Sequence, residues 1–242
     1  MNRILHLIRL DLKQVMRDSM LAIALIGPLL LILVVRYGIP FIREWLYQQF
    51  TLDIMTYSDL ILSFVLVLIP LMLGMLTGFM MLDERDENLI QYYAITPLRK
   101  MGYFLYRLTM PVALSLFYNA LLLCSVQTQL PPLVCIIPVL FMLALEAPLI
   151  TLLLVGFANN KIEGLALSKG IGIVVFVPAI VYFVPFPWHL VASFIPTYWA
   201  AQTLISGMQG NITNSMIYAI IGLLVHILTL WVLAIRFSRR AD

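Results

Sequence analysis

The chain has 242 residues, of which 62% are apolar and only 11% are charged. Soluble domains carry about 25% charged residues, so this composition excludes a soluble globular protein. The net charge of +3 says little as a total, and its distribution along the chain is more informative. The sequence predicts an all-α, polytopic membrane protein with a single transmembrane domain over residues 1–242.

Residues 1–19 are predicted to form an amphipathic helix that lies in the membrane interface. Arg9, Lys13 and Arg17 recur at four-residue spacing, while Ile4 and Ile8 share an apolar face. Basic residues on such a helix face anionic lipid headgroups. The alternative is an ordinary basic flank before the first span. Under either interpretation, the segment lacks the small-residue cleavage site of a signal peptide.

Six apolar runs are long enough to cross a bilayer, which takes roughly 20 apolar residues. Gly74-x-x-x-Gly78, in the second run, permits close approach of another helix. The predicted transmembrane helices are 20–42, 60–82, 103–126, 133–157, 167–186 and 215–237.

The segment from Pro187 to Asn211 differs from both spans and loops. It carries no Asp, Glu, Lys or Arg, and Pro187, Pro196 and Gly207 interrupt it. Irregular backbone at membrane depth must be buried in protein or line water. We therefore expect a re-entrant or interfacial hairpin at the outer surface, before the last span.

The basic residues are unevenly divided between the two sides of these spans. If both termini are cytoplasmic, Arg36 and Arg43 are the only two of the fifteen Lys and Arg residues that lie outward. This is a strong positive-inside bias. It predicts that the stretch between the second and third spans faces the cytoplasm.

That stretch, residues 83–100, is the most charged passage of the chain. Acids lie at its start and Arg99 and Lys100 at its end, an order that suits the dipole of a short helix. Leu89, Tyr92, Tyr93 and Thr96 share one helical face. Pro97 disfavours helix at the preceding residue. We predict a cytoplasmic amphipathic helix over 84–96; the alternative is a solvated loop.

Two segments carry a family resemblance. The run Glu84-Arg85-Asp86-Glu87-Asn88-Leu89, with Thr96-Pro97-Leu98-Arg99 after it, resembles the segment that follows the second span of ABC-2 type transporter permeases. Asp86 and Asn88 stand where the family often has Glu and a small residue. Ile195-Pro196-Thr197-Tyr198-Trp199-Ala200-Ala201 is similar to the segment before the last span of these permeases.

The resemblance implies the membrane-spanning subunit of an ABC exporter in a bacterial cell membrane. It implies two permease chains, identical or different, and two separate ABC-type ATP-binding subunits that bind ATP and Mg. The predicted helix would couple those subunits to the spans. The residues expected to make this contact are Glu84, Arg85, Asp86, Glu87, Leu89, Tyr92, Tyr93, Thr96 and Pro97.

Glu146 is the only acidic residue deep in a predicted span. Ionisable groups at this depth usually face the bundle interior or a water-filled path. A place in the substrate path and a packing role beside Pro148 are equally open. Tyr118 and Asn119 are candidate partners of Glu146, and Tyr198 and Trp199 are further candidates for the path.

The sequence contains no phosphate-binding Gly-x-x-x-x-Gly-Lys-Ser/Thr loop, no His-Glu-x-x-His and no Gly-x-Ser-x-Gly. We expect no enzymatic activity, cofactor, metal or nucleic-acid partner for this chain, and contact with membrane lipid. The predicted function is ATP-driven export of a small amphipathic, drug-like or lipid-like substrate. The alternatives are self-immunity export of a peptide antibiotic and an intramembrane enzyme using Glu146 and His226.

Overall fold

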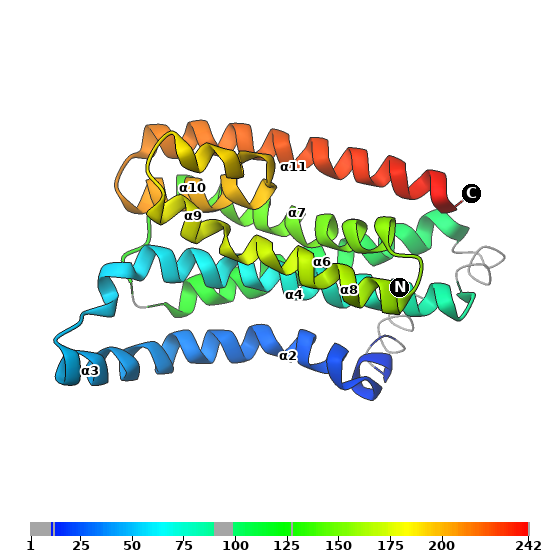
Figure 1. Ribbon diagram of the computed structural model, residues 1–242, viewed down its shortest axis with the longest axis horizontal. Helices are drawn as coiled ribbons and strands as arrows, with labels where there is room; N and C mark the ends of the chain where they lie inside the picture. The colour runs from blue at the N-terminus through cyan, green and yellow to red at the C-terminus, as the bar shows by residue number, and fades with distance from the viewer. Residues whose placement is uncertain (1–10, 12, 90–98, 127, 242) are drawn as a thin grey trace.

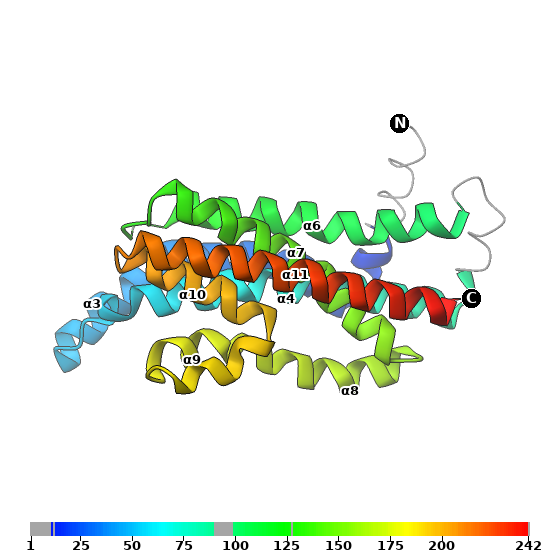
Figure 2. The ribbon, with the colours of Figure 1, turned by 90° about the horizontal axis from the view of Figure 1, so that it is seen from above.

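The computed structural model describes residues 11, 13–89, 99–126 and 128–241. Within these ranges the chain is helical almost throughout and contains no strand. The long helices lie side by side in one elongated bundle (Figure 1, Figure 2). In chain order the elements are α2 (Ser19–Leu33), the π-helical η1 (Val34–Gly38), α3 (Ile39–Phe50), the 3-10 helix η2 (Ile54–Tyr57), α4 (Ser58–Asp86), α6 (Arg99–Ser125), α7 (Leu133–Phe157), α8 (Lys161–Ile171), the 3-10 helix η3 (Gly172–Phe176), α9 (Val177–Phe183), the 3-10 helix η4 (Trp188–Phe194), α10 (Pro196–Met208) and α11 (Ile212–Ala241).

Six helical stretches of the described residues are long and apolar enough to cross a membrane. They confirm the predicted number of membrane-length helices, although the ends of these helices differ from the predicted ones. Their ranges are Ser19–Phe50, Ile54–Asp86, Gly102–Ser125, Leu133–Phe157, Lys161–Phe183 and Ile212–Phe237.

The first span continues to Phe50, eight residues beyond its predicted end at 42, because its helix bends without stopping. Pro40 lacks an N–H and its ring crowds the carbonyl of Arg36, which would break a regular α-helix. The π-helical η1 lies at this point and accommodates the mismatch. Asp18 caps the other end, where its carboxylate accepts from the amide of Met20 at 2.9 Å.

The fifth span begins at Lys161, six residues earlier than the predicted 167. Asn160 caps α8, because its side-chain oxygen accepts from the amide of Glu163 at 2.9 Å. The polar residues that follow Asn160 therefore form the first turn of a helix and not a loop. The span narrows to a 3-10 helix in η3, just before Pro178, whose missing N–H interrupts the regular ladder.

The centre of the bundle is the contact between α4 and α7. A Cβ atom added at Gly74 would lie 2.5 Å from the carbonyl oxygen of Ala147, and one at Gly78 would lie 2.7 Å from the side chain of Leu154. Thr151 donates to the carbonyl of Gly74 at 3.0 Å. The close helix approach predicted from the two glycines is therefore confirmed.

Between α9 and α11 the chain makes a compact hairpin from η4 and α10. Helix α10 packs against α11, α7, α9 and α4, so most of it is buried. In Figure 2 α10 lies beneath α11 at one end of the bundle. The structure thus has two short helices, η4 and α10, where the sequence predicts a hairpin. The position of this hairpin at the outer membrane surface stays a prediction.

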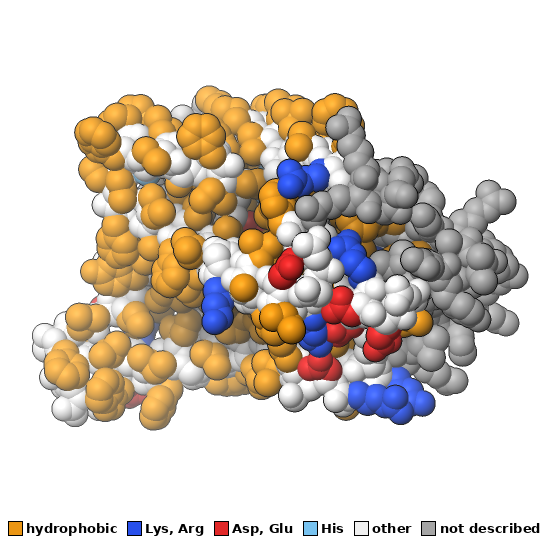
Figure 3. All heavy atoms as spheres, turned by 45° about the vertical axis from the view of Figure 1, so that its right-hand side comes forward, with side chains coloured by type: hydrophobic (Ala, Val, Ile, Leu, Met, Phe, Trp, Pro, Cys, Tyr) orange, Lys and Arg blue, Asp and Glu red, His pale blue; other side chains and the backbone are white. Residues whose placement is uncertain are grey.

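The two ends of the bundle differ in charge. Helix α2 begins and α11 ends at the same end (Figure 1), which also carries Asp18, Asp83, Arg107 and Lys161. We call this the charged end. Figure 3 shows Lys, Arg, Asp and Glu side chains gathered there, whereas the visible remainder is largely apolar. The opposite end, with η2 and the hairpin, is the far end.

Candidate coupling and substrate sites

At the charged end, α4 and α6 are joined by a buried ion pair. Glu84 lies in the last turn of α4 and Arg107 lies two turns into α6, and only 2% and 5% of their surfaces are exposed. The guanidinium of Arg107 contacts both carboxylate oxygens of Glu84, one of them through Nε at 3.1 Å. Tyr103, one turn before Arg107, donates its hydroxyl to the same carboxylate. The charge of Arg107 is therefore compensated within the bundle.

Arg107 also ties the N-terminal segment to α6. Its two terminal nitrogens donate to the carboxylate of Asp11 at 2.9 and 3.0 Å. Tyr106 donates its hydroxyl to Asp11 at 2.6 Å. One guanidinium is thus shared by two carboxylates, which satisfies its planar set of donors and compensates its burial. We call Asp11, Glu84, Tyr103, Tyr106 and Arg107 the clamp.

A second junction, centred on Lys161, joins α8 to the starts and ends of other helices. The Lys161 ammonium lies 2.9 Å from Asp18 and 2.9 Å from Asp83. Its backbone amide donates to Asp86 at 3.1 Å. The hydrogen bond from Lys161 holds the pKa of Asp18 below its usual value, assisted by the amides of Met20 and Leu21.

The predicted coupling residues divide into two groups in the structure. Glu84, Arg85 and Asp86 belong to the end of α4 and bond within the chain; Arg85 donates to the carbonyl of Ala158 at 2.9 Å. They are therefore not the start of a separate helix, because α4 simply continues through them. Glu87 and Leu89 follow α4 and are exposed. The remaining predicted contacts, Tyr92, Tyr93, Thr96 and Pro97, lie outside the described residues.

A cleft of about 560 Å³ opens beside these exposed residues. Both signs of charge line it, with Lys13 and Arg17 on one wall and Asp83 and Glu87 on another. Leu89 supplies an apolar contact at its edge. Charged walls with an apolar anchor are features of a protein contact surface, where charges set orientation and apolar groups supply contact energy.

Deeper in the bundle, Glu146 meets the start of α10. Glu146 is 3% exposed, and its Oε1 accepts a hydrogen bond from the hydroxyl of Thr197, which is 1% exposed. The other carboxylate oxygen has no hydrogen-bond partner among the described residues. The hairpin therefore places the hydroxyl of Thr197 against Glu146, the one acidic residue in the middle of α7.

The other candidates for a substrate path bond elsewhere. Tyr118 donates to the carbonyl of Leu25 at 3.4 Å, and Asn119 donates to Ser115 at 3.3 Å. The expectation that either would partner Glu146 is corrected by the contact with Thr197. Tyr198 pairs with His189 at 2.9 Å, and Trp199 donates to the carbonyl of Ser193 at 2.9 Å. These last two bonds brace the hairpin from within.

The sequence analysis did not identify Thr197, Lys161 or Arg107 as site residues. Thr197 follows the helix-starting Pro196 within the segment that resembles ABC-2 permeases, and this position was the available signal. For Lys161 the available signal was Asn160, a typical N-cap residue that predicts a helix start. Arg107 has its carboxylate partners far away in sequence, so no local pattern pairs them.

Six apolar membrane-length helices in the described residues define the chain as a multi-pass membrane protein. The model of the family described as "Fluoroquinolones export permease protein Rv2686c-like" matches residues 11–234. The chain belongs to this family, which is consistent with the ABC-2 type resemblance. It is thus a transporter component rather than an enzyme.

Two relatives come from Mycobacterium tuberculosis. Fluoroquinolones export permease protein Rv2686c, from strain ATCC 25618 / H37Rv, is 28% identical over 236 residues, which cover 96% of this chain and 92% of the relative. Fluoroquinolones export permease protein MT2760, from strain CDC 1551 / Oshkosh, matches with the same identity and coverage. No solved structure matches the chain.

Proposed function

We propose that this chain is the membrane-spanning subunit of an ATP-driven exporter whose ATP-binding subunit is a separate chain. The charged end faces the cytoplasm, in agreement with the positive-inside rule. The substrate is a small amphipathic, drug-like molecule, as the printed names of the two relatives suggest. Two permease chains form the complete transport path.

The observation that carries the proposal is the clamp between Glu84 and Arg107. The chain between Asp86 and Arg99 connects α4 to α6, and Glu84 and Arg107 of the clamp join those two helices near the ends that this connection links. A force that a partner applies to that segment acts on α4 and α6 together, because moving the two helices apart would break the buried ion pair between Glu84 and Arg107. Removing one partner of such a buried pair costs about 3–5 kcal/mol.

Motion of α4 and α6 reaches the middle of the membrane through α7. The two helices both pack on α7, which carries Glu146 and through it the start of α10. A rigid-body displacement at the charged end therefore changes the surroundings of Glu146. The displaced and undisplaced arrangements of the helices are two conformations in equilibrium. ATP binding to the partner shifts this equilibrium only if the partner binds the two conformations with different affinity.

The test is coexpression of the chain with the ATP-binding subunit from the same organism, followed by copurification, ATPase assay and fluoroquinolone efflux from vesicles. We expect Glu87→Ala combined with Tyr93→Ala to weaken association or to uncouple hydrolysis from efflux. Lys169→Ala, an exposed-surface change on α8, is the control. Wild-type association, ATPase stimulation and efflux in the double variant would refute the coupling assignment.

Orientation is tested separately by cysteine labelling. In a background without Cys124 and Cys135, a cysteine at Glu87 should react only from the cytoplasmic side, and one at Gln129 only from outside. Both positions are exposed in the structure. External labelling at position 87 would reverse the topology and remove the basis for a cytoplasmic partner.

A further inference from the structure

The cleft at the charged end is lined by residues from three spans or from the segments beside them. Lys13 and Arg17 precede α2, and Asp83 lies in the last turn of α4. Lys161, the first residue of α8, also belongs to the lining. The coupling route through the clamp includes no residue of α8. A partner that occupies the cleft therefore also contacts the fifth span, through Lys161.

The side chain of Lys161 connects three helices at this point. Its ammonium lies 2.9 Å from the carboxylate of Asp18, the cap of α2, and 2.9 Å from that of Asp83. Its backbone amide donates to Asp86 at 3.1 Å. An ammonium is a compact point charge, so one group can hold both carboxylates. Lys161 thereby ties the starts of α2 and α8 to the end of α4.

Close packing around this junction also fixes the start of α8 on α4. A Cβ atom added at Gly164, in the first turn of α8, would lie 2.5 Å from the side chain of Leu82. Arg85 donates to the carbonyl of Ala158, in the turn between α7 and α8, at 2.9 Å. The inner half of the fifth span is therefore held against α4.

The outer half of the fifth span packs on the hairpin. Val177 and Val181 of α9 form a hydrophobic cluster with Ala192 of η4 and with Tyr198 and Ala201 of α10. This cluster is distinct from the larger core around α4 and α7. Tyr198 directly follows Thr197, the residue that donates to Glu146. Motion of the fifth span is therefore passed on to the start of α10.

Two routes thus lead from the charged end to the hydrogen bond in the middle of the bundle. One runs through α4, α6 and α7 to Glu146, and the other runs through α8 and α9 to Thr197. Each route ends at one partner of the same bond. The geometry of this bond therefore depends on whether the two routes move together, and the second route leaves α4 at Lys161.

We propose that Lys161 is a positioning residue of the coupling contact, which makes the fifth span follow α4 when the ATP-binding subunit acts on the charged end. This inference rests on the proposed export function and adds the fifth span to the elements that the partner moves. The ion pairs of Lys161 are partly exposed, and such pairs contribute little to stability. Their loss leaves a folded protein in which the two routes are no longer held together.

The test uses vesicles that contain the chain together with its ATP-binding subunit. Association, ATPase activity and fluoroquinolone efflux are measured for wild type and Lys161→Met, which removes the charge but keeps a side chain of similar length. We expect wild-type association and basal ATPase activity, with efflux per ATP hydrolysed reduced at least about fivefold, the low end of coupling between distant sites. Lys161→Arg keeps the charge and should restore most of the efflux.

A double-mutant cycle assigns the effect to the ion pair. Asp83→Asn removes the carboxylate on α4 and should lower efflux per ATP as Lys161→Met does. The combined variant should be no worse than either single one, because both changes remove the same interaction. Losses that add in the combined variant, or a wild-type ratio in Lys161→Met, would overturn the proposal.

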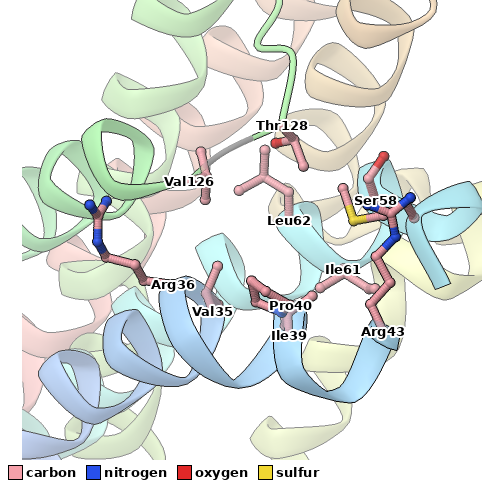
Figure 4. Close-up of a pocket in the computed structure, with 11 residues that line it drawn as sticks. Val35, Arg36, Ile39, Pro40, Arg43, Ser58, Ile61, Leu62, Val126 and Thr128 are labelled. Atoms are coloured by element: carbon pink, nitrogen blue, oxygen red, sulfur yellow. The ribbon is translucent and has the colours of Figure 1, made fainter. Parts of the chain in front are cut away.

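The matched control is an ion pair at the far end. Arg43 of α3 binds both oxygens of Asp53, at 3.0 and 3.1 Å. Figure 4 shows Arg43 at a small groove between the first span and the start of α4, away from the cleft. Arg43→Met should leave efflux per ATP unchanged. An equal fall in Arg43→Met and Lys161→Met would show that loss of any ion pair disturbs transport, and the role of Lys161 would be wrong.

Wild type separates failure of this inference from failure of the proposed function. If wild type neither binds the ATP-binding subunit nor exports the drug, the export function is wrong and the inference falls with it. If wild type exports and Lys161→Met exports equally per ATP hydrolysed, only the role of Lys161 is wrong. Size-exclusion elution verifies folding of each variant. Should Lys161→Met aggregate, Asp83→Asn gives the same test with Lys161 intact.

Discussion

Arg107 of α6 forms an ion pair with Glu84 of α4 at the charged end, and both side chains are almost completely buried. Glu84 is the last buried residue of α4 before the connection to α6 begins. Asp11 extends the pair into a three-residue ion cluster that includes the N-terminal segment. Three parts of the chain that are distant in sequence therefore meet at one guanidinium.

Arg107→Gln should destabilise the protein strongly. The change leaves the buried carboxylate of Glu84 without a compensating charge, at a cost of about 3–5 kcal/mol. Replacing both members, as Glu84→Leu with Arg107→Leu, should recover part of the loss because the most deeply buried carboxylate is removed together with its cation, although Asp11 still loses its partner. Thermal unfolding in detergent measures both effects. A double variant less stable than either single one would contradict this account.

Gly74→Ala should also destabilise the bundle, although alanine normally favours a helix. The added methyl would meet the Ala147 backbone at 2.5 Å, so α4 and α7 must separate, at about 1–3 kcal/mol. Gly170→Ala is the matched control, since its Cβ would meet nothing within 4 Å. That variant should be neutral or up to about 1 kcal/mol more stable. Equal effects of the two changes would show that close packing is not responsible.

The ion pair of Asp18 and Lys161 should make stability depend on pH in acid. The pKa of Asp18 is lower in the folded state than its unfolded value of about 3.9. The stabilisation is therefore fully present above the unfolded pKa and is lost as the pH falls through the folded pKa. Asp18→Asn keeps a capping side chain but removes the charge, and should cost up to about 1 kcal/mol at pH 7.

The measurement is the difference in melting temperature between wild type and Asp18→Asn, followed from pH 7 down to pH 3. This difference should shrink below about pH 4 and also at high salt, because the pair is partly exposed. A difference that stays constant over this range would mean that capping, and not charge, accounts for the effect.

Glu146→Gln should leave the protein folded while drug efflux falls. Glutamine can still accept the hydrogen bond from Thr197, so the hairpin keeps its anchor, but the ionisable group is gone. Thr197→Val should instead loosen the hairpin and lower stability by about 1–3 kcal/mol, because the buried carboxylate loses its partner. Efflux from vesicles and thermal unfolding separate the two effects.

Thr229→Val is the control for the threonine change, since Thr229 bonds only within its own helix, to the carbonyl of Val225. It should alter neither efflux nor stability appreciably. Wild-type efflux by Glu146→Gln at every pH tested would restrict Glu146 to the packing role that the sequence also left open.

The class of protein and the number of its membrane-length helices could be predicted from the amino-acid sequence. Run length and apolar content were sufficient for six spans, because a bilayer imposes a minimum length on each helix. Gly74 and Gly78 predicted a close helix contact for a similarly local reason, the absence of side chains at neighbouring turns. The arrangement of Pro187, Pro196 and Gly207 likewise predicted an interrupted segment before the last span.

The pairing of the buried polar groups could not be predicted, because it depends on contacts between residues far apart in the sequence. Glu84 and Arg107 are 23 residues apart, and Glu146 and Thr197 are 51 residues apart. In a membrane protein the lipid-facing and buried sides of a helix are similarly apolar, so hydrophobic periodicity does not tell which side faces another helix. Only the packing of α4, α6, α7 and α10 brings these partners within hydrogen-bond distance.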